Sequence, residues 1–110
     1  MQDGGRFMLV LVTAPPGAAA ESLARSLVEA GLAACVSRVG PVRSAYRWRG
    51  KIESDKEELL LIKTSRDLLD RVERLVRENH PYEVPEILAI PIALGSAPYL
   101  EWLAGSLREE

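Results

Sequence analysis

The hydrophobic pattern at the start of the chain predicts a strand followed by a helix. Residues 7–14 form a continuous apolar run, which is typical of a strand buried on both faces. From residue 20 onward the apolar positions recur at helical spacing, and Gly31 is a suitable left-handed helix stop. The pattern therefore predicts an amphipathic helix with a buried stripe of Ala20, Leu23, Ala24, Leu27 and Val28.

The middle of the chain is predicted to form a long β-hairpin. Its first strand is interrupted at Gly40-Pro41, and beyond that point polar and apolar positions alternate. Gly50-Lys51 is predicted to be a two-residue type II′ turn, and the return strand covers residues 52–64. A strand of about 15 residues is about 50 Å long, whereas a domain of this size has a radius of gyration of about 13 Å. We therefore expect the hairpin tip to project beyond the helices.

The second half of the chain repeats the order of helix and strand. Ser65 is a good N-cap for a second helix, which is predicted to end near His80. Residues 86–94 are predicted to form a strand in which Pro91 indicates an edge or a bulge, and Ser96 caps a short last helix. The resulting prediction is an α+β fold, the ferredoxin-like βαββαβ arrangement with an added C-terminal helix.

Length, charge and cysteine content narrow the class of protein. The 110 residues carry a formal net charge of −2, which fits one domain and gives no general attraction to nucleic acid or anionic lipid. We predict a flexible N-terminal tail over residues 1–5 and a single domain over residues 6–110. One cysteine allows no intramolecular disulfide, and no apolar run approaches the roughly 20 residues of a membrane helix. We therefore expect a cytoplasmic protein without a membrane partner.

The projecting hairpin predicts self-association. It carries Tyr46, Trp48 and Ile52 beyond the helices, and its strands have free edges. Natural monomers seldom leave such a surface uncovered, so we expect a closed homo-oligomer in which the hairpin packs on a neighbouring subunit. The alternative is that Gly40-Pro41 bends the hairpin back over its own core.

The residues able to carry chemistry favour binding over catalysis. The sequence has no recognised nucleophile motif, and one cysteine with one histidine cannot form a closed zinc site within one chain. In an oligomer, Cys35 or His80 could meet Glu83 or Glu86 around copper or another divalent cation. The alternatives are a small buried strand residue at Cys35 and a helix-ending residue before Pro81 at His80.

Nucleic-acid binding is not expected either. Arginines interleave with Tyr46 and Trp48, as they do in some RNA-binding sheets, but strand alternation places arginines and aromatic residues on opposite faces. We expect a solvated basic face and a packed aromatic face. The segment "TAPPGAAAE" matches no phosphate-binding motif and is predicted to be a plain turn.

Several stretches, in order and spacing, resemble the CutA family of divalent-cation-tolerance proteins. They are "LVEAGLAACVS" (27–37), "YRWRGKIE" (46–53), "ELLLIKT" (58–64), "HPYEVPEILAIPI" (80–92) and "YLEWL" (99–103). The resemblance implies a homotrimer, similar in shape to the PII signalling proteins, whose long hairpins pair across subunits. It also implies a link to copper and other divalent-metal tolerance, copper binding, and no enzymatic activity. No cofactor is expected to be needed for folding.

The resemblance also implies a set of site residues near clefts between subunits. The metal candidates are Cys35, His80 and Glu86, and the other cleft residues are Tyr46, Trp48, Lys63 and Tyr82. The sequence departs from the usual family pattern at Ser37, at residues 38–40 and at Ser96, none of which is a candidate ligand. Two alternatives to metal binding stay open: a PII-like sensor of a small anion, and a structural trimer that binds other proteins.

Overall fold

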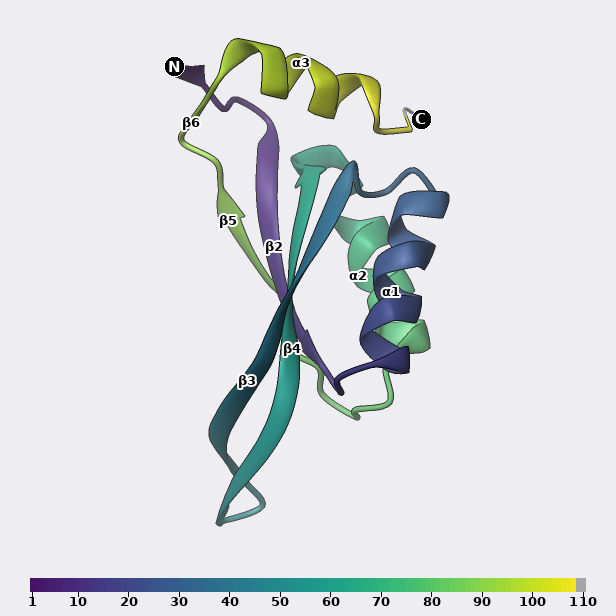
Figure 1. The fold of residues 1–110 in the computed structure, drawn as a ribbon, viewed down its shortest axis with the longest axis vertical. Helices are drawn as coiled ribbons and strands as arrows, with labels where there is room; N and C mark the ends of the chain where they lie inside the picture. Colours follow the sequence, from purple (N-terminus) through teal and green to yellow (C-terminus); the bar gives the residue numbers. More distant parts are fainter. Residues whose placement is uncertain (109–110) are drawn as a thin grey trace.

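The computed structural model describes residues 1–108 and has the predicted α+β architecture, with two helices on one face of an antiparallel sheet and the C-terminal helix across one end of it (Figure 1). The sheet has the strand order β3-β4-β2-β5, in which all neighbours are antiparallel, as in a ferredoxin-like fold. Its strands are β2 (Phe7–Ala14), β3 (Cys35–Trp48), β4 (Lys51–Ser65) and β5 (Leu88–Pro91). The helices are α1 (Ala18–Glu29), α2 (Leu69–Asn79) and α3 (Ala97–Gly105).

The core lies between the sheet and the pair α1 and α2. Alternate residues of β2 and β4 point toward the two helices, and the apolar stripe of each helix covers them. Of the stripe predicted for α1, only Val28 is exposed, and Gly31 has the expected positive φ of 73°. The fully buried residues of this core include Val10, Val12, Leu23, Leu27, Leu60, Ile62, Val72 and Val76.

Helix α2 begins later than predicted, because the short 3-10 helix η1 (Arg66–Leu68) follows Ser65. The helix ends where the sequence indicated, at His80, whose extended backbone (φ −93°, ψ 136°) is the conformation favoured before a proline. Pro91 lies in β5, which is an edge strand, as predicted. None of the described helices is long and apolar enough to cross a membrane.

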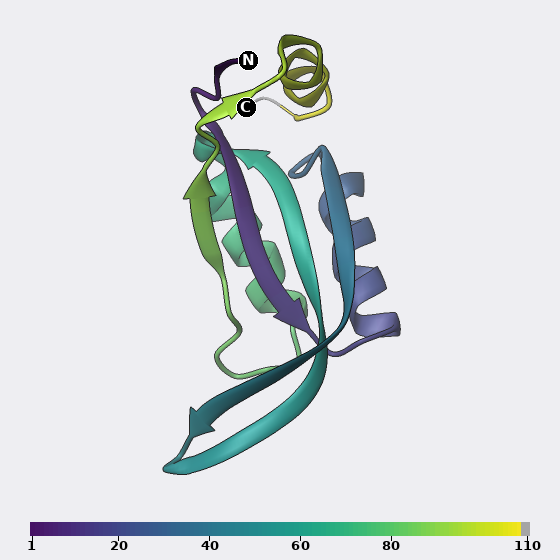
Figure 2. The ribbon, with the colours of Figure 1, turned by 60° about the vertical axis from the view of Figure 1, so that its left-hand side comes forward.

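The long hairpin formed by β3 and β4 projects well past the ends of α1 and α2 (Figures 1 and 2). The molecule measures 44 × 26 × 22 Å. The pairing of β3 with β4 shifts register once, between Val39 and Val42. The hairpin does not fold back over its own core. The predicted turn was wrong by one residue, because the loop is Arg49-Gly50. Both have positive φ (51° and 80°), as a type I′ turn requires.

A salt bridge anchors the hairpin where it leaves the domain. The guanidinium of Arg38 donates two hydrogen bonds to Glu58, of 2.7 and 2.9 Å, and Glu58 also accepts the backbone N–H of Gly17 at 2.8 Å. The segment before α1 is therefore more than a plain turn. The backbone N–H of Gly17, which has no partner within the helix, donates to the carboxylate of Glu58 on the hairpin.

The N-terminal residues, for which the sequence predicts a flexible tail, include a short strand. Gln2–Asp3 form strand β1, which pairs with β6 (Leu94–Gly95) near α3. The backbone N–H of Gly4 also donates to the carbonyl of Ala93 at 2.9 Å. Local sequence patterns missed this pairing, because two-residue strands carry no periodicity.

The sheet face opposite α1 and α2 carries no helix along its middle (Figure 2), and most of its side chains there are aliphatic. We call this surface the open face. The strand register groups its residues in rows across the sheet, and none of them belongs to the buried core clusters. The open face carries six aliphatic residues together with Thr13 and Lys63, which are the cross-strand partners of Leu59 and Leu9; the aliphatic residues are Leu9, Leu11, Leu59, Leu61, Leu88 and Ile90.

Candidate functional site

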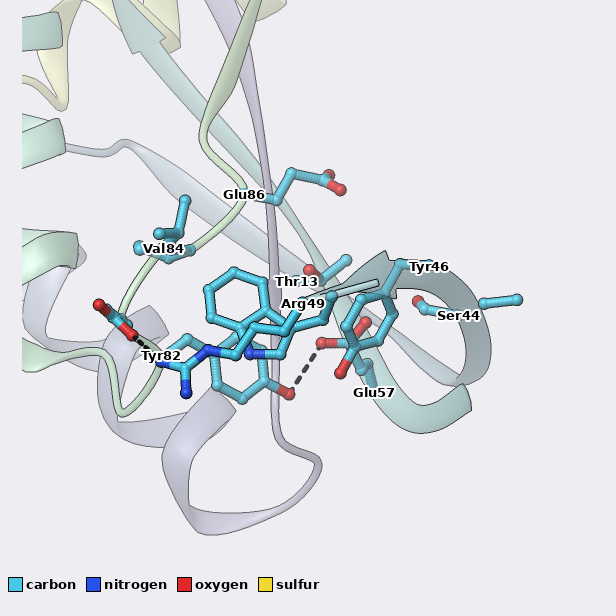
Figure 3. Close-up of a pocket in the computed structure, with 12 residues that line it drawn as sticks. Thr13, Ser44, Tyr46, Arg49, Glu57, Tyr82, Val84 and Glu86 are labelled. Atoms are coloured by element: carbon cyan, nitrogen blue, oxygen red, sulfur yellow. Dashed lines mark hydrogen bonds and ion pairs between the residues drawn. The ribbon is translucent and has the colours of Figure 1, made fainter. Parts of the chain in front are cut away.

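A pocket of about 800 Å³ lies between the projecting hairpin and the loop that joins α2 to β5. The hairpin contributes Tyr46, Trp48 and Glu57, and the loop contributes Tyr82 and Glu86 (Figure 3). Strand alternation explains the arrangement, because Tyr46 and Trp48 are two residues apart and point to the same side of the ribbon. Four of the seven predicted site residues therefore meet in this pocket.

Glu57 is the buried carboxylate of the pocket. Only 4% of the residue is exposed, and its Oε2 accepts a hydrogen bond of 2.9 Å from the hydroxyl of Tyr82. Figure 3 shows Tyr82 reaching from the loop toward Glu57 on the hairpin. Burial of the phenol, and then its hydrogen bond to Glu57, raise the pKa of Tyr82, so that its hydroxyl stays protonated at neutral pH.

A second tyrosine lies on the hairpin side of the pocket. The hydroxyl of Tyr46 donates to Oδ2 of Asp55 on the paired strand. That hydrogen bond is the main reason why the pKa of Tyr46 is raised to about 12. Both phenols are thus neutral at physiological pH, and each hydroxyl oxygen keeps a lone pair for a ligand.

His80 lies behind the pocket and holds the loop in place. Its Nδ1 accepts the backbone N–H of Tyr82 at 3.1 Å, so Nε2 carries the proton and donates to the carbonyl of Thr13 at 2.7 Å. The ring also packs against that of Tyr82, with centroids 4.6 Å apart. Both nitrogens are engaged and the residue is buried, so metal binding at His80 would require one of these bonds to break.

Cys35 and Lys63 lie at the other end of the sheet, outside the pocket. They are direct partners on β3 and β4, and Nζ of Lys63 lies 3.8 Å from the sulfur of Cys35 and 2.7 Å from the hydroxyl of Ser37. Lys63 in turn pairs with Leu9, four residues before Thr13 on β2. Four residues of strand span about 13 Å. Cys35 and Lys63 therefore lie about that far along the sheet from Thr13, the hydrogen-bond partner of His80.

The three predicted metal ligands consequently do not converge within one chain. A zinc-sized ion holds a sulfur and a nitrogen ligand within about 4.5 Å of each other, much less than the separation of Cys35 from His80. Among residues 1–108, no three His, Cys, Asp or Glu side chains are grouped closely enough to hold a metal ion. A site that uses Cys35 and Glu86 would need two subunits.

The pocket is acidic rather than basic. Glu57, Glu83 and Glu86 line it, and its single cationic side chain is that of Arg49. The guanidinium of Arg49 lies 5.5 Å from the ring centroid of Trp48 and 3.4 Å from Glu83 (Figure 3). The charge of this pocket therefore does not favour the predicted small-anion sensor, and the predicted Lys63 does not reach it.

Comparison with known proteins identifies the family. The family model described as "CutA1 divalent ion tolerance protein" matches residues 8–106. The chain belongs to the CutA1 family. A crystal structure of CutA1 from Oryza sativa is 47% identical, covers 96% of each chain and superposes with a TM-score of 0.92, so the predicted fold is confirmed as that of CutA1 proteins.

Two further CutA relatives show the range of the family. Protein CutA of Arabidopsis thaliana, described as chloroplastic, is 50% identical over 92% of this chain and 56% of its own length. The divalent-cation tolerance protein CutA of Thermus thermophilus is 46% identical over 86% of this chain and 92% of its own length. The chain thus spans little more than half of the plant relative. CutA proteins are not confined to one compartment, so membership of the family does not test the predicted cytoplasmic location.

Sequence reasoning about this CutA1 chain missed Glu57 and Arg49. Glu57 occupies the same face of β4 as Leu59 and Leu61, a carboxylate in phase with an apolar row. That phase was the available signal, because a charged residue in line with packed positions is seldom simply solvated. Arg49 gave no comparable signal, since its position depends on the turn type.

Proposed function

We propose that this CutA1 chain acts as a cytoplasmic, non-enzymatic homotrimer in divalent cation tolerance and binds the cation at clefts between subunits. The open face is the observation that carries the proposal. A row of aliphatic side chains on an uncovered sheet is a surface that normally packs against protein. Beside it, the hairpin extends away from its own domain with free strand edges and with Ile52 66% exposed, which a neighbouring subunit would cover.

The proposed cation ligands are Cys35 and Glu86. Neither uses a strong hydrogen bond of the fold, whereas His80 would have to release Thr13 or Tyr82. Thiolate and carboxylate ligands together suit copper and zinc, so copper or another divalent ion fits the donor set. Packing around a three-fold axis would bring such groups of different subunits together, which one chain cannot do.

Metal titration of matched variants tests the ligand assignment. Copper(II) and zinc(II) binding would be measured by calorimetry for the wild type, Cys35→Ser, Glu86→Gln and the control Glu101→Gln, which removes an exposed carboxylate on α3. We expect Cys35→Ser and Glu86→Gln to weaken binding by at least about tenfold and the control to leave it unchanged. Zinc is included because it does not oxidise the thiol. Equal affinity in all four proteins would contradict the assignment.

A further inference from the structure

Glu57 has a buried charge that the fold leaves without a cation. The residue is only 4% exposed, yet no ion pair among the described residues includes its carboxylate. Its one hydrogen-bond donor in the structure is the neutral hydroxyl of Tyr82. A buried carboxylate is costly unless a positive group pairs with it, so the position favours a cationic occupant.

The walls beside Glu57 are aromatic. Tyr46, Trp48 and Tyr82 line the same pocket, and the two tyrosines also bring neutral hydroxyl groups to it. The ring of Trp48 already has a cation over it, the guanidinium of Arg49. Aromatic faces attract ammonium groups through the ring quadrupole and also pack against the attached alkyl carbons.

The charge at the pocket rim also favours a cationic ligand. Arg49 is paired only with Glu83, and their side chains are 75% and 71% exposed, so this ion pair is weak and can open. With Glu57 and Glu86 the rim and base carry a net negative charge. A volume of about 800 Å³ is in the range of small-molecule sites.

We propose that this pocket binds a small organic cation, a primary or quaternary alkylammonium compound. Its charged nitrogen pairs with Glu57, and its alkyl part lies against Trp48 and Tyr46. Arg49 competes for the same space and opens the pocket when it leaves Glu83. The proposal does not depend on metal binding, because Glu57 is not among the proposed metal ligands.

Tryptophan fluorescence tests the proposal in the whole 110-residue chain. Trp102→Phe removes the second indole, which lies on α3 outside the pocket, so the signal reports Trp48 alone. The probes are 1,4-diaminobutane and tetramethylammonium, with 1,4-butanediol as the neutral control and acetate as the anionic one. We expect a saturable change with the ammonium probes only. No saturation up to about 10 mM, or the same response to the diol or acetate, would overturn the proposal.

Three variants made in the Trp102→Phe background test which charged side chain binds the ammonium group. Glu57→Gln keeps the shape of the side chain and should weaken ammonium binding by at least about tenfold, as loss of a buried charge partner does. Glu101→Gln, a remote charge control, should change nothing. Arg49→Gln removes the competing cation and should tighten binding by a few-fold. In variants whose circular dichroism matches that of the parent, unchanged affinity in Glu57→Gln, or weaker binding in Arg49→Gln, would contradict the proposal.

These variants also separate the ammonium site from the metal site. Glu57→Gln should leave the copper and zinc titrations unaltered, and Cys35→Ser should leave ammonium binding unaltered. Loss of metal binding in Cys35→Ser with intact ammonium binding would support both proposals independently. Loss of both activities in Glu57→Gln, with the variant still folded, would contradict the separate ammonium site.

Discussion

His80→Ala tests whether the single histidine serves the fold. The substitution removes the acceptor of the Tyr82 N–H and the donor to the Thr13 carbonyl, bonds of 3.1 and 2.7 Å around a residue that is 8% exposed. Each buried group left without a partner costs about 1–3 kcal/mol. Two such groups therefore predict a loss of about 2–5 kcal/mol in the free energy of unfolding, since water entering the vacated space recovers part of the cost.

His80→Asn is the matched control, because its side-chain oxygen can replace Nδ1 as the acceptor two residues before Tyr82 but cannot reach Thr13. It should cost about half as much. Guanidinium unfolding followed by circular dichroism, at one fixed chain concentration, measures both values. A loss below about 1 kcal/mol for His80→Ala would refute the structural role. A copper affinity that falls in His80→Ala as much as in Cys35→Ser would restore His80 as a ligand.

The remaining predictions concern the hairpin base and the open face. Arg38, and then the N–H of Gly17, lower the pKa of Glu58 below its ordinary 4.5, so the pair stabilises the fold above that pH and the benefit is lost as the pH falls through the lowered pKa. Glu58→Gln should therefore reduce stability at pH 7, and denaturation at decreasing pH should show its difference from the wild type disappearing; a difference independent of pH would contradict this. Leu61→Glu places a charge in the open face and should dissociate the oligomer, which light scattering would detect as a lower mass; an unchanged mass would exclude that face from the interface.

Most of the fold was predictable because its signals are local. The apolar run of β2, the helical spacing before Gly31 and the alternation through Trp48 each reflect one element and its buried face. The projecting hairpin followed from strand length alone. The pairing of β1 with β6 was not predictable, because it depends on tertiary contacts between short segments far apart in the chain. The turn was misplaced because Arg49 adopts a positive φ that its residue type rarely takes.

The candidate site was predicted less completely than the fold. Tyr46, Trp48, Tyr82 and Glu86 share a pocket within one chain, whereas the family resemblance implied clefts between subunits for them. Residue type made Cys35 a plausible metal ligand, but the register places it beside Lys63, away from that pocket. Hydrogen-bond partners such as the Thr13 carbonyl of His80 cannot be inferred from a pattern, because they depend on how a loop crosses a strand. For the same reason the sequence did not indicate Glu57, because its burial depends on how the loop with Tyr82 packs against the hairpin.

The central claim is that the open face and the hairpin are completed by other copies of this chain. Multi-angle light scattering during size exclusion, at decreasing concentration, tests it most directly. The account predicts a mass three times the 12.1 kDa of one chain, maintained on dilution. A folded species with the mass of a single chain would contradict it, because the aliphatic face and the aromatic hairpin would then be stable in water without a partner.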